Sequence, residues 1–139
     1  GHQVKWEFSL GSNVYSDDYY CAYEVNDRVY VYHSLMGESL YVLDLDGEME
    51  WSLDSIDSRP AVDENGTVYV ETWLDGDDHP SFCAYDADGV LVWSHPVPNG
   101  SSIYDITVGP EGNVYSGHEV WDGSSNSVME LMAFSPGGD

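Results

Sequence analysis

The sequence predicts an all-β protein built from three copies of one short unit. Trp6, Trp51 and Trp93 open similar segments, at spacings of 45 residues (51 − 6) and 42 residues (93 − 51). Between them, runs rich in Val and Tyr alternate with turns containing Gly, Asn and Asp, and no segment has a helical period. A repeat in the low forties that consists of short strands is typical of β-propeller blades. We therefore expect three four-stranded antiparallel blades.

Each unit is expected to contain four strands. We place the first strands at residues 20–24, 58–63 and 105–109. Tight turns follow them, because Asn-Gly and Pro-x-Gly tolerate the positive φ that hairpins require. We place the second strands at residues 28–32, 67–71 and 113–117. A longer loop then leads to third strands at residues 39–44, 82–86 and 128–134.

The fourth strand of each unit carries the tryptophan. Asp-x-Asp-Gly turns at Asp44–Gly47 and Asp86–Gly89 lead into it. We place it at residues 48–53 and 90–94 in the first two copies. The third copy reaches the same point at Pro136–Asp139, where no tryptophan strand follows. Residues 3–10 have the missing pattern, so we expect this N-terminal strand to complete the last blade of the same or another chain.

The repeats predict a single domain over residues 1–139. Its blades are expected at about 11–53, 54–95 and 96–139, plus the strand 3–10. Three blades are too few for a ring, because propellers typically have four to eight. Two chains could exchange N-terminal strands and close a six-bladed ring, chains could add head to tail into a filament, or this is a piece of a longer propeller. The boundaries fall on the blade period, which favours exchange through Gln3, Val4, Lys5, Trp6, Glu7 and Phe8.

Three segments resemble the PQQ-like (quinoprotein-type) β-propeller repeat family, and the likeness extends over nearly the whole chain. They are residues 40–51, 60–70 and 84–93. In that family the tryptophans dock against the neighbouring blade, which implies structural docking roles for Trp6, Trp51 and Trp93. One large aromatic residue per unit beside a glycine-marked turn also favours packing over ligand binding.

The family resemblance does not imply a redox cofactor here. Dehydrogenases of the family hold pyrroloquinoline quinone in a full ring with a calcium-type metal, a catalytic acid and, in many cases, adjacent cysteines. Cys21 and Cys83 are far apart and fall on different strand types, so we expect free, buried thiols. The chain looks like the family members that act as scaffolds without a cofactor.

The charge balance excludes two classes of partner. The chain has 26 acidic residues and only three basic ones, for a formal net charge of −23. Nucleic acids and anionic membranes are bound through Lys and Arg, so neither is an expected partner. No apolar run is long enough to insert into a bilayer. Molar salt screens repulsion between carboxylates, so we hypothesise a halophilic source, with an ordinary acidic or cation-binding surface as the alternative.

The loop Thr72–Pro80 is the best candidate for a ligand site. It contains Asp75, Asp77, Asp78 and His79, which could hold a cation such as calcium, and Trp73 could stack on a sugar ring. An acidic solvated loop is the simpler interpretation. His33 and His118 occupy equivalent ends of second strands and could join a metal site in an assembled ring, if the blades between them allow it.

Other motifs give weak signals. Asn65 and Asn99 match the N-glycosylation pattern, although Asn-Gly is also a preferred turn pair. The sequence contains no Gly-x-Ser-x-Gly elbow and no phosphate-binding glycine loop. We therefore expect a non-enzymatic, self-assembling propeller scaffold, extracellular or on the cell surface. The alternatives are a ligand-binding propeller module for calcium or a glycan, and a fragment of a larger PQQ-like enzyme.

Overall fold

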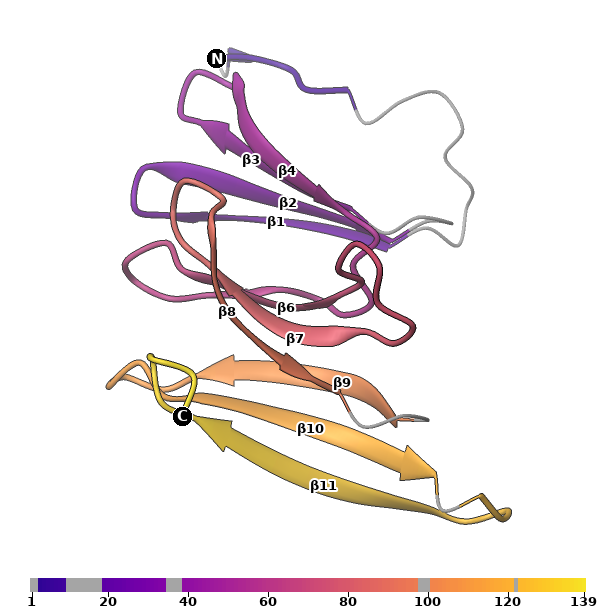
Figure 1. Cartoon of the computed structure of the whole chain (residues 1–139). Helices are drawn as coiled ribbons and strands as arrows, with labels where there is room; N and C mark the ends of the chain where they lie inside the picture. The colour runs from indigo at the N-terminus through magenta and orange to yellow at the C-terminus, as the bar shows by residue number, and fades with distance from the viewer. Residues whose placement is uncertain (1–2, 10–18, 35–38, 98–100, 122) are drawn as a thin grey trace.

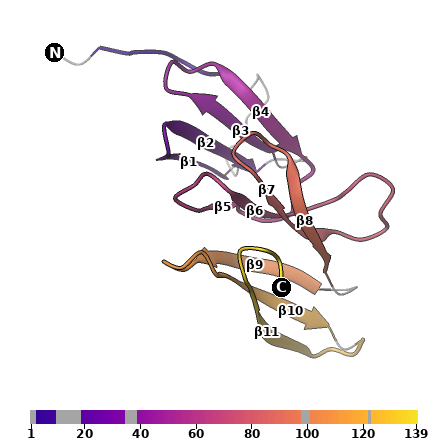
Figure 2. The same ribbon diagram turned by 60° about the vertical axis from the view of Figure 1, so that its left-hand side comes forward.

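A computed structural model describes residues 3–9, 19–34, 39–97, 101–121 and 123–139. Within these ranges the chain forms eleven β-strands and no helix, which confirms the predicted all-β class. The strands make three antiparallel sheets that follow one another along the chain. Figure 1 shows the three sheets stacked as layers, and Figure 2 shows the same order from another side.

The sheets are built from consecutive strands. The first sheet contains Tyr19–Val25 (β1), Arg28–Ser34 (β2), Ser39–Asp44 (β3) and Met49–Asp54 (β4). The second sheet contains Ala61–Val62 (β5), Val68–Thr72 (β6), Ser81–Tyr85 (β7) and Leu91–Pro96 (β8). The third sheet contains Ser101–Val108 (β9), Val114–Trp121 (β10) and Ser127–Phe134 (β11). Each strand therefore pairs with its neighbour in sequence, as hairpins do.

Three features differ from the sequence prediction. The third sheet has three strands rather than four, and residues 3–9 are not in a strand. Strand β5 is only Ala61–Val62, and it begins directly after Pro60, which has no N–H to donate to a ladder. Strand β9 begins at Ser101 rather than at residue 105, and β10 continues to Trp121 rather than ending at residue 117. The strands are longer because Val120 still pairs with Ser101 on β9, and Trp121 with Ser127 on β11.

The register of the outermost strand is the same in the two complete sheets. Val42 on β3 lies opposite Trp51 on β4, and Ala84 on β7 lies opposite Trp93 on β8. In both pairs the register then shifts by one residue, toward the turn that joins the strands. A shared bulge at one position shows that the sheets repeat in detail as well as in topology.

Two hydrophobic clusters join the layers. The first packs Tyr30, Tyr32, Leu40 and Val42 of the first sheet against Ile56, Val68, Val70, Cys83 and Tyr85. The second packs Tyr69, Phe82 and Ala84 of the second sheet against Val97, Ile103, Ile106, Val114 and Phe134. Side chains alternate between the faces of a strand, so β6 supplies Val68 and Val70 to one cluster and Tyr69 to the other. The second sheet is thus covered on both faces, and every residue of β6 and β7 is buried.

Candidate functional site

Trp51 connects the first sheet to the second. Its indole N–H donates to the backbone oxygen of Ala87 over 2.9 Å. A Cβ added to Gly89 would lie only 2.8 Å from the Cδ2 atom of the same ring. The indole therefore lies flush against the turn Asp86–Gly89, and only glycine leaves room for it.

Trp93 makes the same contact one layer further on. Its indole N–H donates to the backbone oxygen of Pro136 over 3.1 Å, and a Cβ on Gly138 would lie 2.8 Å from the ring. The rings of Phe82 and Phe134 both have their centroids 5.6 Å from that of Trp93. The turn that ends the third sheet is Ser135–Gly138, so it binds its tryptophan despite lacking the Asp-x-Asp-Gly sequence.

Trp6 repeats this contact on the first sheet. Its indole N–H donates to the backbone oxygen of Leu45 over 3.0 Å, and a Cβ on Gly47 would lie 2.6 Å from the ring. Phe8 follows it, with its ring centroid 5.7 Å from that of Tyr41. Residues 3–9 therefore contact the first sheet in the same way that β4, a strand of the first sheet, contacts the second sheet. Strand β8 of the second sheet contacts the third sheet likewise.

Residues 3–9 lack the strand partner that β4 and β8 possess. Strand β4 is paired with β3 and β8 with β7, whereas residues 3–9 belong to none of the sheets that the described residues form. Figure 1 places them at the top of the stack, beyond β3 and β4, and places β11 at the bottom. The expected completion of the last sheet by the same chain is therefore not what the structure has, because Trp6 holds the segment at the opposite end of the stack.

Strand β11 is unusually exposed for its position in the sheet. The third strands of the complete sheets are protected: β7 is buried throughout, and β3 at four of its six residues. Six of the eight residues of β11 are exposed. Val128, Met129 and Leu131 are exposed by 55%, 62% and 75%. A free sheet edge with apolar side chains offers a template on which another strand can pair.

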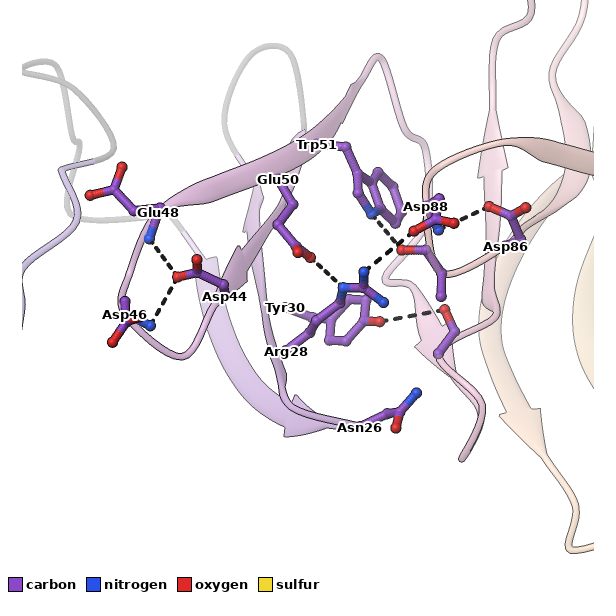
Figure 3. A network of polar contacts seen from close by, with 12 residues as sticks. Asn26, Arg28, Tyr30, Asp44, Asp46, Glu48, Glu50, Trp51, Asp86 and Asp88 are labelled. Atoms are coloured by element: carbon purple, nitrogen blue, oxygen red, sulfur yellow. Dashed lines mark hydrogen bonds and ion pairs between the residues drawn. The ribbon is translucent and has the colours of Figure 1, made fainter.

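Arg28 forms a bridge between sheets that the sequence alone did not indicate. Its guanidinium pairs with Glu50 of its own sheet and, at 3.4 Å, with Asp88 in the turn of the second sheet (Figure 3). The hydrogen bond to Glu50 raises the pKa of Arg28. Tyr30 donates to the backbone oxygen of Gly66 nearby. Arg28, one of the three basic residues, thus links two sheets. The sequence gives no sign of this role, because Asp88 is 60 residues away along the chain.

The Asp-x-Asp-Gly carboxylates serve the turns themselves. One oxygen of Asp44 accepts the backbone N–H groups of Asp46 and Glu48, both at 2.9 Å. Asp86 accepts those of Asp88 and Val90 in the same way. These carboxylates therefore stabilise tight turns through local hydrogen bonds.

The acidic loop does not gather its candidate ligands into one site. Asp75, Asp77 and Asp78 are exposed, and the closest contact of His79 to them is 3.6 Å, to Asp78. Across the described residues, no three side chains of the His, Cys, Asp and Glu types are placed to hold a metal ion. Trp73 donates its indole N–H to Asp57 over 2.6 Å and leaves 44% of its surface exposed.

The two histidines considered as ligands of a shared metal site are buried in different layers. His33 lies in β2 of the first sheet and His118 in β10 of the third, with the second sheet between them. Nε2 of His118 is 2.9 Å from the hydroxyl of Ser116, and burial lowers the pKa of His118. Its Nδ1 atom has no hydrogen-bond partner among the described residues. The two imidazoles therefore do not converge within one chain.

The remaining candidates are the two cysteines and the two asparagines of the glycosylation pattern, and part of this set lies outside the described residues. Cys83 is a free thiol in the core, and burial raises its pKa to about 12. The side chain of Cys21 and the whole of Asn99 lie outside the described part of the chain. Asn65 is exposed in its turn, and its backbone oxygen accepts a hydrogen bond from Asn26.

A cleft of about 550 Å³ lies between the turns Asp63–Gly66 and Gly109–Gly112, with Pro136 on its wall. Three acidic residues line it, Asp63, Glu64 and Glu111, and the carboxylate of Asp63 is already engaged. One oxygen accepts two backbone N–H groups at 2.9 Å, and the other accepts the hydroxyl of Tyr69. Burial raises the pKa of Tyr69 to about 12, which keeps this hydroxyl a donor.

The solved structures that are similar to this chain include one distant likeness. No protein-family model matches the chain, and no curated protein is significantly similar in sequence. The crystal structure of a protein of unknown function from Bacteroides caccae is similar with a TM-score of 0.46 at 9% sequence identity. The match covers 86% of this chain and 47% of that one, so the chain spans about half its length. No helix that could span a membrane occurs among the described residues.

Proposed function

We propose that this chain is a three-bladed propeller unit of the PQQ-like type that functions as a non-enzymatic scaffold and assembles with itself. In this assembly, residues 3–9 of one copy add as the fourth strand beside β11 of another copy. The observation that carries the proposal is the pair of unmatched elements: a tryptophan segment with no strand partner, and a third strand with no outer neighbour. Adding a strand to a free edge supplies backbone hydrogen bonds and covers apolar side chains.

The two elements suit one another chemically. β11 presents Val128, Met129 and Leu131, and the segment contributes Val4, which is 74% exposed. Trp6 and Phe8 already anchor the segment to the first sheet of their own copy, so its position is fixed before it meets a second copy. Pre-ordering reduces the entropy that association costs. The acidic surface suits an extracellular or cell-surface setting at high salt, with a second copy as the partner.

The test measures particle mass after each unmatched element is altered. Intact protein in molar KCl is expected to form oligomers, whereas a variant lacking residues 1–9 is expected in light scattering at the mass of a single chain, below the 15.5 kDa of the intact monomer. Leu131→Lys is expected to raise the dissociation constant by roughly two orders of magnitude, about 3 kcal/mol of binding free energy. The reason is that it places a charge in the apolar contact between β11 and residues 3–9 of the other copy.

Val92→Lys is the matched control. Val92 is also an exposed residue of an outer strand, at 58%, but it lies on β8 and not on β11 or the N-terminal segment. It should assemble like the intact chain. An oligomer that survives the deletion and Leu131→Lys would refute strand exchange. A monomeric intact chain would refute self-assembly, and would favour a longer chain that supplies the missing blades.

A further inference from the structure

The sheets repeat closely enough to identify equivalent residues across all three. In each sheet, the turn that follows the third strand (β3, β7 or β11) binds a tryptophan. The indole donates to the backbone oxygen of the second turn residue, which is Leu45, Ala87 or Pro136. In each turn the N–H of the glycine also donates to the first residue, over 3.2, 3.0 and 2.9 Å. The first turn residues Asp44, Asp86 and Ser135 are therefore equivalent. Counting back from them aligns β11 with β3 and β7.

This alignment exposes a missing layer. Leu131 is equivalent to Leu40 and Phe82, and Ala133 is equivalent to Val42 and Ala84. In β10, Tyr115 lies opposite Ala133, as Tyr30 lies opposite Val42 in the first sheet and Tyr69 opposite Ala84 in the second. The equivalents in the first two sheets are all buried, with exposures of 0% or 1%. Leu131 is 75% exposed and Tyr115 is 39% exposed.

The face that would cover them is also present in the chain. The second sheet covers the first through Val68 and Val70, whose equivalents on the first sheet are Val29 and Val31 of β2. Val68 and Val70 are fully buried, whereas Val29 and Val31 are only partly buried. The two contacts within the chain therefore define a third contact of the same kind, between the last sheet of one copy and the first sheet of another.

From this continuity we infer that a second copy binds in one particular register, with Trp6 of one copy opposite Ala133 of the other. Its first sheet then covers Tyr115 and Leu131. The inference rests on the proposed strand exchange and specifies its geometry. Following β3–β4 and β7–β8, the remaining pairs are Glu7 with Met132, Phe8 with Leu131, Ser9 with Glu130 and, beyond the bulge, Val4 with Phe134. Trp6 and Phe8 then share the face that Trp51 and Leu53 share in the first sheet.

The same geometry sets the size of the assembly. Because the three tryptophan contacts are alike, successive sheets turn in the same sense around one axis, and a ring must contain a multiple of three sheets. Only six lies within the four to eight that propellers typically use. An assembly made of this chain alone is therefore a ring of two copies, in which each donates its residues 3–9 to the other, and the interface is isologous.

Paired cysteines test the register. In a background that carries Cys21→Ser and Cys83→Ala, the test variants are Glu7→Cys with Met132→Cys and Phe8→Cys with Leu131→Cys. Neighbouring cross-strand pairs alternate between wide and close spacing, so one of these two has the short Cβ–Cβ distance that a disulfide needs. The control is Glu7→Cys with Glu130→Cys, which would match a two-residue slip. The cysteine-free background must first have the oligomer mass of the natural chain.

Mild oxidation followed by a non-reducing gel separates the outcomes. The expected result is a major band at about 31 kDa (2 × 15.5 kDa) for one in-register pair and almost none for the control. A ladder of higher multiples would overturn the closed ring, and cross-linking in the control alone would overturn the register. In both cases the proposed strand exchange would survive. Monomers in light scattering before oxidation would refute the proposed exchange itself.

Discussion

At the scale of single residues, the contact between Trp51 and Gly89 shows why each layer needs glycine in its turn. Gly89 has a φ of +82°, where a residue with a Cβ is strained, and the indole occupies the space that the Cβ would need. Both effects act on a position 38 residues away from the tryptophan in sequence (89 − 51). The tryptophan and the glycine therefore function as one packing unit.

Gly89→Ala is expected to lower the free energy of unfolding by about 2–5 kcal/mol, which combines backbone strain with displacement of the ring. Gly76→Ala is the matched control, because Gly76 has a φ of +87° but nothing within 4 Å of its added Cβ. It should lose only the backbone part, about 1–2 kcal/mol. Urea denaturation measures both variants, and equal losses would mean that the Trp51 contact contributes nothing to stability.

At the scale of the elements, packing between the second and third sheets depends on a buried imidazole. His118 lies on β10 on the same face as Val114 and Ser116, and it is 1% exposed. Burial is the main cause of its lowered pKa, and neighbouring His95 of β8 contributes in the same direction. Glu130, opposite His118 on β11, acts in the other direction but does not outweigh burial. Protonation would therefore place a charge between the two layers that is only partly compensated.

Acid should therefore weaken this contact. The unfolded chain keeps the ordinary His pKa of 6.5, so between that value and the lower folded pKa the unfolded state binds more protons. The contribution of His118 to the free energy of unfolding is therefore fully present above pH 6.5. It is lost as the pH falls through this window. His118→Gln should reduce the loss between about pH 7.5 and about pH 5 in urea denaturation. His95→Gln, an exposed histidine of the facing sheet, should retain most of it, and identical pH profiles for all three proteins would contradict the assignment.

At the scale of the whole molecule, negative charge is the dominant property. The 26 acidic residues are opposed by only three basic ones, for a net charge of −23, and one of the three, Arg28, is already paired between two sheets. At about 0.1 M salt the Debye length of ~10 Å lets carboxylates repel across much of the surface, whereas at about 1 M it falls to ~3 Å. Two such copies must overcome the same repulsion to associate.

The melting temperature is accordingly expected to rise by at least about 5 °C between dilute buffer and molar KCl. Differential scanning calorimetry at a fixed protein concentration measures it, because association would add its own concentration dependence. The variant lacking residues 1–9 serves as the control, since a gain that persists in it arises within the chain. An unchanged melting temperature in both proteins would contradict the salt-adapted interpretation.

Much of the fold could be read from local patterns. Alternating apolar residues and turn pairs such as Asn65-Gly66 depend on neighbours in sequence, so they located eight of the eleven strands to within two residues at each end. They located β5, β9 and β10 only approximately. The repeated tryptophans likewise indicated the three layers. The acidic loop illustrates the limit: Asp75, Asp77 and Asp78 are close in sequence, but their side chains point into solvent rather than toward one another.

Contacts between distant segments were settled only by the folded chain. Trp6 meets Leu45, Arg28 meets Asp88, and His33 and His118 are separated by an intervening sheet. Sequence alone predicted that residues 3–10 would form a strand, but the described part, residues 3–9, has no strand partner because Trp6 binds the far end of the stack from β11. Local pattern thus determines which residues can form strands, whereas packing between layers determines which strands lack a partner, because burial is a property of the assembled stack.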